Sequence, residues 1–131
     1  MRMRRKPWAR PELAASPFCY DEYSNAPTLY RGKWRQQFAR PEAPLWLELG
    51  CGKGRFTANT AEANPDVFLV AIEKVPDAMV IAMERCQSMG LTNVFYIDMD
   101  VANIEEIFAG EEIDRLFINF PDPWPRKKNA K

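Results

Sequence analysis

Four short apolar segments, separated by helix-like and turn-rich stretches, constrain the fold of this chain more than any other feature. They occupy residues 45–49, 67–72, 93–97 and 114–120. Between them, the spacing of apolar residues predicts helices over about 56–62, 76–89 and 104–108. Strands that alternate with helices form a parallel sheet whose right-handed crossovers place helices on both faces. The sequence therefore predicts an α/β fold with a Rossmann-like, doubly wound parallel sheet.

The segments outside this pattern suggest how the chain is organised. Residues 1–30 are rich in Pro and Arg and lack a clear period, so we expect an irregular arm. Residues 31–40 predict a short amphipathic helix with Trp34 and Phe38 on one face. We therefore divide the chain into a basic N-terminal arm and short helix (1–40) and a main domain (41–131). The last apolar segment is typical of an interior strand, so we expect further C-terminal strands to be missing from a truncated chain.

Composition excludes several kinds of chemistry. The chain has no histidine, which excludes Ser–His and Cys–His nucleophile pairs and any histidine metal site. Its three cysteines, Cys19, Cys51 and Cys86, do not have the spacing of a disulfide framework or a zinc site. No apolar run has the length of a membrane span, and no apolar stretch of signal-peptide type follows the basic N-terminus. We expect a cytoplasmic protein without a metal or a membrane partner.

Charge is unevenly distributed although the net charge is +0. Residues 1–40 carry nine basic and three acidic residues, residues 41–120 carry five and fourteen, and residues 121–131 carry four and one. Two basic ends that fold onto one face would form a surface for a polyanion. The alternative is that both ends are solvated tails.

The first candidate site is the glycine-rich segment 48–54, Glu-Leu-Gly-Cys-Gly-Lys-Gly, which follows the first predicted strand. Gly50, Gly52 and Gly54 allow a ligand to approach the backbone closely. Arg55 stands where the dinucleotide fingerprint has its third glycine. Glu48 would sit poorly beside a pyrophosphate but well beside a sulfonium or amino group. The segment therefore favours S-adenosylmethionine over a nicotinamide dinucleotide; the alternative is a glycine-rich turn without a ligand.

Acidic residues also follow the next two predicted strands, at the edge where such sheets bind ligands. Glu73 is placed to accept hydrogen bonds from both hydroxyl groups of a ribose, or is a solvated acid at a strand end. Asp98 and Asp100 follow the third strand, where an acid can accept a hydrogen bond from the amino group of adenine. Either of these two could instead cap the helix that begins near residue 104.

The fourth predicted strand runs into the segment 119–128, Asn-Phe-Pro-Asp-Pro-Trp-Pro-Arg-Lys-Lys. Its three prolines favour a rigid, extended backbone that would hold Asp122 and Trp124 at the reactive end of the cofactor. Rigid placement suits methyl transfer, which depends on proximity and orientation. The basic run after it could contact phosphates. The alternative is a proline-rich loop followed by solvated charges.

Three motifs together resemble the bacterial tRNA (guanine-N7-)-methyltransferase family. They are residues 1–9 (Met-Arg-Met-Arg-Arg-Lys-Pro-Trp-Ala), 48–54 and 119–125 (Asn-Phe-Pro-Asp-Pro-Trp-Pro), in that order along the chain. The resemblance implies a fold of the class I S-adenosylmethionine-dependent methyltransferase type. It also implies methyl transfer from S-adenosylmethionine to N7 of the guanine at position 46 of tRNA.

The resemblance assigns roles to particular residues. Cofactor-binding positions fall on Glu48, Glu73, Asp100 and Asp122, and Asp122 also falls on the position regarded as catalytic. Arg126 stands where the family usually has a substrate-binding lysine, and Arg and Lys are not equivalent in such contacts. Residues of the RNA-contacting segment also include Lys127, Lys128 and Lys131.

The implied chemistry agrees with the absence of histidine. Guanine N7 carries an unprotonated lone pair at neutral pH and needs no general base. A carboxylate such as Asp122 could orient the base and stabilise the positive charge that it acquires.

Three other functions remain as alternatives. A nucleotide-dependent oxidoreductase predicts an intact third glycine, which Arg55 contradicts. A methyltransferase for another substrate offers no reason for the basic ends. A non-catalytic tRNA-binding fragment would bind tRNA in a salt-dependent way without transferring a methyl group.

Overall fold

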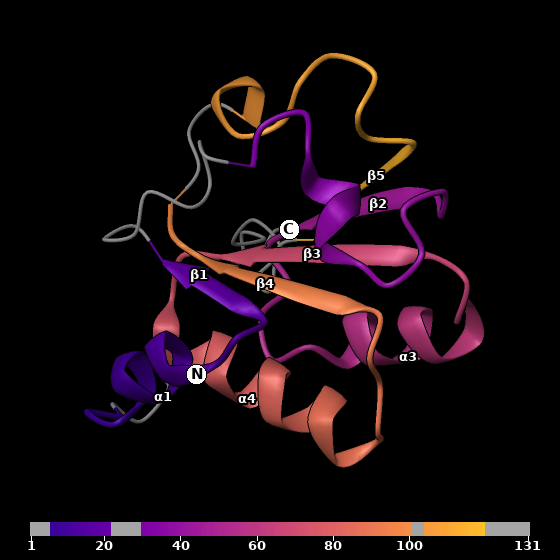
Figure 1. Ribbon diagram of the computed structural model, residues 1–131. Coiled ribbons are helices and arrows are strands. Elements are labelled where there is room, and N and C mark those ends of the chain that lie inside the picture. The colour runs from indigo at the N-terminus through magenta and orange to yellow at the C-terminus, as the bar shows by residue number, and fades with distance from the viewer. Residues whose placement is uncertain (1–5, 22–29, 101–103, 120–131) are drawn as a thin grey trace, which may run out of the picture.

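The computed structural model describes residues 6–21, 30–100 and 104–119, which form a parallel sheet covered on both faces (Figure 1). In these residues the strands are β1 (Cys19–Asp21), β2 (Leu45–Leu49), β3 (Phe68–Glu73), β4 (Val94–Asp98) and β5 (Arg115–Ile118). The helices are α1 (Ala9–Ala15), α3 (Arg55–Ala63) and α4 (Pro76–Ser88), with 3-10 helices η1 (Trp34–Gln37) and η2 (Ile104–Glu106). The predicted α/β fold with a parallel sheet is confirmed.

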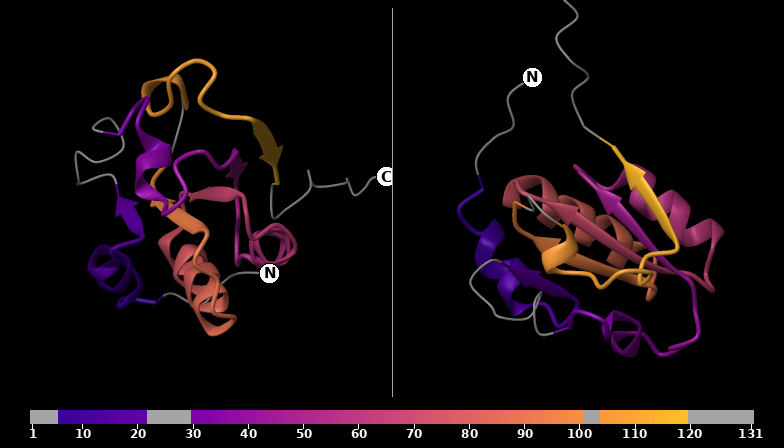
Figure 2. Two further views of the ribbon diagram at one scale, coloured as in Figure 1. Left: turned by 45° about the vertical axis from the view of Figure 1, so that its right-hand side comes forward. Right: turned by 90° about the horizontal axis from the view of Figure 1, so that it is seen from above.

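The strand order, β1-β4-β3-β2-β5, shows where the chain changes direction across the sheet. From β2 the chain steps through β3 to β4, and it then returns to place β5 on the other side of β2. Right-handed crossovers in opposite directions lie on opposite faces. Accordingly, α3 and α4 cover one face together with α1, whereas η1 and η2 cover the other (Figures 1 and 2). The helix predicted over 104–108 is only a 3-10 turn, so in the described residues the α-helices lie on one face.

Two apolar cores sandwich the sheet, and β3 contributes to both. Its side chains alternate, with Phe68, Val70 and Ile72 in the core under η1 and η2. Leu69 and Ala71 face the core under the α-helices. Every residue of β3 is buried. A parallel strand that is covered on both faces reads as a continuous apolar run, which explains the sequence of this segment.

The prediction of an irregular arm is wrong for part of residues 1–30. Helix α1 buries Ala9 and Leu13 in the same core as α4, and β1 extends the sheet by pairing with β4. The backbone N–H of Tyr96 donates to the carbonyl of Phe18 at 2.8 Å. Helix α1 buries only one pair of residues four positions apart, and β1 has only three residues. These are too few to produce a recognisable hydrophobic periodicity in the sequence. The division of the chain at residue 40 stays a prediction.

The amphipathic helix predicted over 31–40 is shorter and tighter than expected. Only Trp34–Gln37 is helical, as a 3-10 turn, although Trp34 is fully buried as the pattern indicated. The buried carboxylate of Glu112 accepts the backbone N–H groups of Gly32 (2.8 Å), Trp34 (2.9 Å) and Ala109 (2.9 Å). Glu112 therefore competes with helical hydrogen bonding at the start of this segment and fastens it to the loop before β5.

Strand β5 is held in register by Asp114. The Asp114 backbone N–H donates to the carbonyl of Leu45, and its carboxylate accepts the Leu45 N–H, both at 2.8 Å. Arg35 also donates to this carboxylate. The Leu45 hydrogen bond is the main cause that lowers the pKa of Asp114, with Arg35 acting in the same direction against partial desolvation. These contacts fix where β5 begins beside β2.

In the described residues β5 is an edge strand that pairs with β2. Its side chains Leu116 and Ile118 are exposed. They pair in register with Leu47 and Leu49 of β2. The expectation that this strand is interior to a larger sheet stays a prediction.

Gly54 determines how closely the loop after β2 approaches α4. Its φ is +84°, and a Cβ atom built there would lie 2.5 Å from Cβ and 2.6 Å from Cα of Ala82. Since the second contact is to backbone, the clash cannot be relieved by a rotamer change. Gly90, after the C-terminus of α4, has a similar φ of +71° but nothing within 4 Å of such a Cβ.

We expect Gly54→Ala to destabilise the protein much more than Gly90→Ala. Both replacements place an L-residue in the left-handed region, at about 1–2 kcal/mol each. Gly54→Ala adds the overlap with α4, roughly 1–3 kcal/mol more. Urea unfolding of the two variants and the unsubstituted chain measures the difference. Equal losses in free energy of unfolding would show that α4 can move away and that the close approach is not a constraint.

Candidate functional site

The carboxyl ends of β2 and β5 flank the point where the strand order reverses, which is where open α/β sheets bind ligands. A cavity of about 270 Å³ opens there. It is lined by the end of β2, the glycine loop, the start of α3, one residue of α4 and the residue after β5: Glu48, Gly50, Cys51, Gly52, Lys53, Gly54, Arg55, Phe56, Arg85 and Asn119. The structure thus brings four of the predicted cofactor-binding residues, Glu48 and the three glycines, to one cavity.

Among the described residues that line this cavity, Glu48 is the one acid, and it is fully buried. The hydroxyl of Thr57 donates to Oε1, and the side-chain amide of Asn119 donates to Oε2 at 3.1 Å. Burial raises the pKa of Glu48 above its ordinary value; the two hydrogen bonds oppose this rise, and the nearby Glu73 adds to it. In the part of the chain that the structure describes, no basic side chain forms an ion pair with Glu48. A buried carboxylate with neutral donors and an adjacent cavity is suited to a cationic ligand group.

Glu73 lies at the end of β3 and contacts the glycine loop rather than the cavity. Its Oε1 accepts the backbone N–H of Gly52 at 2.8 Å, and its Oε2 accepts that of Val75 at 3.1 Å. The side chain is buried and joins the glycine loop to the turn before α4. Each oxygen retains a second acceptor position. Binding of ribose hydroxyls by Glu73 stays a prediction.

The two acids after β4 differ sharply in environment. Asp98 is fully buried at the register position beside Glu73, and its Oδ1 lies 4.0 Å from Nη2 of Arg10 in α1. Asp100 is exposed. The exposed position of Asp100 leaves it accessible to a ligand, whereas Asp98 helps to hold α1 against the sheet. Asp100 does not line the cavity, and its binding role stays a prediction.

Several predicted site residues lie outside the described residues. They are the proposed catalytic residue and the basic residues assigned to the substrate: Asp122, Arg126, Lys127, Lys128 and Lys131. Trp124 also lies there.

Sequence reasoning assigned no site role to Thr57, Phe56 and Arg85, and it named Asn119 only as the first residue of the segment 119–128. Thr57 is fully buried on α3 although it is polar, and Asn119 follows an apolar strand. For both residues, the available signal was a polar side chain at a position where the predicted helix or strand would be buried. Arg85 donates from Nε to the carbonyl of Lys53 at 3.1 Å, so α4 also supports the glycine loop.

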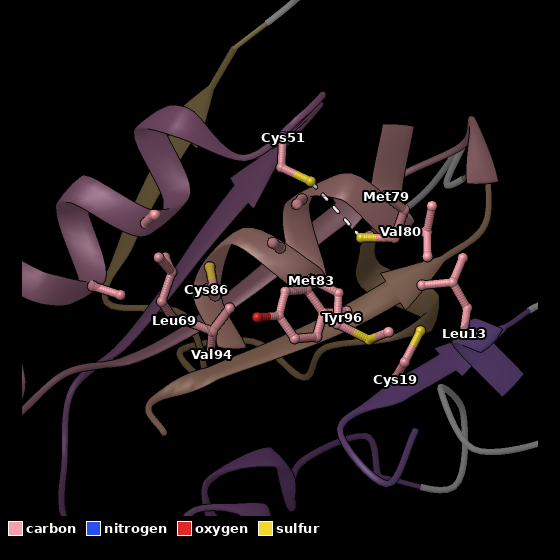
Figure 3. Packing of buried hydrophobic residues seen from close by; sticks show 14 of the residues in the cluster. Leu13, Cys19, Cys51, Leu69, Met79, Val80, Met83, Cys86, Val94 and Tyr96 are labelled. Carbon is pink, nitrogen blue, oxygen red and sulfur yellow. Dashed lines mark hydrogen bonds between the residues drawn. The ribbon is translucent and has the colours of Figure 1, made fainter. Parts of the chain in front are cut away.

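The glycine loop is anchored to the core through Cys51. Its thiol lies 3.9 Å from the sulfur of Met79 on α4, as Figure 3 shows. Burial is the main cause that raises the pKa of the Cys51 thiol, so this cysteine is an apolar anchor rather than a nucleophile. All three cysteines are buried.

A parallel sheet with a glycine loop and buried acids at its topological switch point defines the class of Rossmann-like cofactor-binding domains. Residues 42–131 match a family model described as "Putative methyltransferase". The chain belongs to this methyltransferase family, whose members require a methyl donor. In the described residues, no helix is long and apolar enough to cross a membrane.

Curated relatives with a specific name cover the whole chain. A tRNA (guanine-N(7)-)-methyltransferase from Halalkalibacterium halodurans is 41% identical over 131 residues, which are 100% of this chain and 58% of that protein. The proteins of the same name from Clostridium acetobutylicum and Geobacillus kaustophilus are 40% and 38% identical, over 100% of this chain and 60% and 58% of their own lengths. The chain thus spans about three fifths of the length of these relatives.

Among solved structures, the YcgJ protein from Bacillus subtilis matches with a TM-score of 0.37 and 19% identity. The match covers 55% of this chain and 31% of that chain.

The burial of Glu48 predicts a pH-dependent effect of Glu48→Gln on stability. Because folding raises the pKa of Glu48, its contribution to stability is fully present below the unfolded pKa and is lost as pH rises through the folded pKa. A glutamine side chain would keep the shape and accept from Thr57, and Asn119 can turn its amide oxygen toward the new amide. We therefore expect the variant to gain free energy of unfolding relative to the unsubstituted chain as pH rises, by up to about 1.4 kcal/mol per pH unit within that window.

Urea unfolding between pH 4.5 and pH 8 checks this expectation. Glu62→Gln is the matched control, since Glu62 is exposed on the same helix as Thr57. A stability difference for Glu48→Gln that does not change with pH would contradict a buried charge at this position.

Proposed function

We propose that this chain is the cofactor-binding part of an S-adenosylmethionine-dependent enzyme that methylates N7 of guanine 46 in tRNA. The observation that carries the cofactor proposal is Glu48, a buried acid beside a cavity at the switch point with no basic ion-pair partner in the described residues. S-adenosylmethionine is the methyl donor that presents two cationic groups, an ammonium and a sulfonium, to such an acid.

The remaining charges of the cavity fit the same ligand. Lys53, Arg55 and Arg85 contribute basic groups to the lining, and Glu48 contributes the buried acid. An amino-acid moiety carries one ammonium and one carboxylate, so it matches a lining with groups of both signs. The diphosphate of a dinucleotide has only negative charge and would lie against Glu48 unfavourably. These charges favour S-adenosylmethionine over a nicotinamide dinucleotide as the ligand.

The tRNA substrate is supported by the names of the relatives and by the charge pattern. Three relatives that match the whole chain are named tRNA (guanine-N(7)-)-methyltransferase. The basic residues concentrate in residues 1–40 and 121–131, and clustered Lys and Arg are typical of proteins that bind a polyanion. We propose that Arg126, Lys127, Lys128 and Lys131 contact tRNA near the target base. The protein would then work in the cytoplasm, where tRNA is available.

The proposed chemistry requires positioning rather than proton transfer. Guanine N7 presents a free lone pair, so the absence of histidine from the chain is no obstacle. We propose that the carboxylate of Asp122 orients the guanine and stabilises the positive charge that develops on it.

Transfer of a labelled methyl group from S-adenosylmethionine to a tRNA transcript tests this function. We expect labelled 7-methylguanine at position 46 and no label in a matched transcript with adenine at that position. The assay is run with this chain alone and with the chain joined to the part of the Halalkalibacterium halodurans relative that it does not match. Label elsewhere in the tRNA, or none in the joined protein, would contradict the proposal. Salt-dependent tRNA binding without transfer would favour a non-catalytic tRNA-binding fragment.

Asp122→Asn should slow methyl transfer by roughly 10²–10³-fold in the active protein, because it removes the negative charge next to the developing cation. Single-turnover rates at saturating tRNA measure the effect on the chemical step. Asp66→Asn is the control, because Asp66 is exposed and lies far from Asp122 in the sequence. An Asp122→Asn variant with full methyl transfer would remove Asp122 from the mechanism.

A further inference from the structure

The two side chains that hold Glu48 come from elements far apart in the sequence. Thr57 lies in the first turn of α3 and is fully buried. Asn119 directly follows β5, and its backbone N–H donates to the carbonyl of Leu49 at 2.9 Å, which fixes it beside the end of β2. Glu48 therefore has one donor on each carboxylate oxygen, one from a helix and one from the neighbouring strand end.

This arrangement leaves Glu48 able to bind a ligand. An ionised carboxylate has about four acceptor positions, and Thr57 and Asn119 occupy one on each oxygen. Glu48 and Asn119 line the cavity, whereas Thr57 lies behind them and is not part of the lining. Held from two sides, the carboxylate cannot rotate away from the cavity without losing one of these hydrogen bonds.

The surrounding charges do not replace these two donors. The ionisable groups that act on Glu48 or share its cavity come from the glycine loop, α3, α4 and the end of β3: Lys53, Arg55, Arg85, Glu73, Cys51 and Cys86. The three basic side chains form no ion pair with Glu48 in the described residues, and Glu73 repels its negative charge. Hydrogen bonds from Thr57 and Asn119 are what lowers the pKa of Glu48 against its burial.

We propose that Thr57 and Asn119 are positioning residues that keep Glu48 charged and aimed at the ammonium group of the bound cofactor. The inference rests on the proposed function, because the ammonium belongs to S-adenosylmethionine. Asn119 has a second consequence, since it precedes the segment that contains Asp122 in the sequence. The Asn119 side chain thus joins the last described residue after β5 to Glu48, the acid proposed to bind the cofactor.

Two ligands that differ in the ammonium group separate positioning from general stabilisation. S-adenosylhomocysteine retains the amino-acid moiety, whereas 5′-methylthioadenosine lacks it and keeps the adenosine. We expect Thr57→Val and Asn119→Ala each to weaken binding of S-adenosylhomocysteine roughly tenfold and to leave binding of 5′-methylthioadenosine within about twofold. Thr57→Ser should restore binding because it returns the hydroxyl donor. Thr60→Val, further along α3, is the matched control.

The pH profile gives an independent readout. Binding of S-adenosylhomocysteine requires ionised Glu48, and loss of a donor raises the pH at which Glu48 loses its charge. The pH below which binding fails should therefore move upward in Thr57→Val and Asn119→Ala, but not in Thr60→Val. Calorimetric titration of the 131-residue chain between pH 5 and pH 8.5 measures affinity and profile together.

The outcomes distinguish this inference from the proposed function. If the unsubstituted chain binds neither ligand, the cofactor proposal itself fails. If it binds S-adenosylhomocysteine but both variants bind it equally well with the same pH profile, Thr57 and Asn119 do not position Glu48. Equal weakening for both ligands would show that the two residues only maintain the fold, and it would also overturn the inference.

Discussion

The buried carboxylate of Glu48 is the group on which the arrangement of the site depends. Burying a charged oxygen is costly without hydrogen-bond donors, and Thr57 and Asn119 supply one donor to each oxygen of Glu48. This requirement links three elements: α3 must carry Thr57 beneath the strand, and β5 must stop beside Leu49 so that Asn119 faces Glu48. The geometry of the site is therefore a consequence of sheet register and helix placement, not of the loop alone.

Close packing of the glycine loop on α4 makes that placement rigid. At Gly54 the loop approaches Ala82 so closely that no side chain fits between them, and the thiol of Cys51 lies against Met79. Glu73 also holds the loop, through the Gly52 amide. The glycines of the motif thus allow close packing as well as close approach of a ligand. Gly54 in particular is explained by its contact with α4.

The sequence predicted the features that local pattern determines. Strands β3 and β4 follow from the sequence because burial on both faces leaves a continuous apolar run. The placement of Glu48 near the end of β2 follows from the glycines directly after that strand. Helix α1 and strand β1 could not be predicted in the same way. Helix α1 has only two buried residues, and β1 is a strand because it pairs with β4. The contacts of Thr57 and Asn119 with Glu48 were missed because Glu48 lies 9 and 71 residues away from them, a relationship that no local pattern reveals.

Glu48 also connects binding with stability. Its ionised form opposes folding because it is buried, yet the same charge is what the cavity offers to a cationic ligand. A cation bound there interacts with the folded state alone and stabilises it by mass action. The buried charge that opposes folding in the absence of a ligand is therefore the same charge that attracts a cationic ligand. Replacement of Glu48 by a neutral residue of the same shape would make the empty domain more stable and less able to bind, which is the usual conflict between stability and a charged binding site. The buried acid is for this reason better explained by binding than by folding.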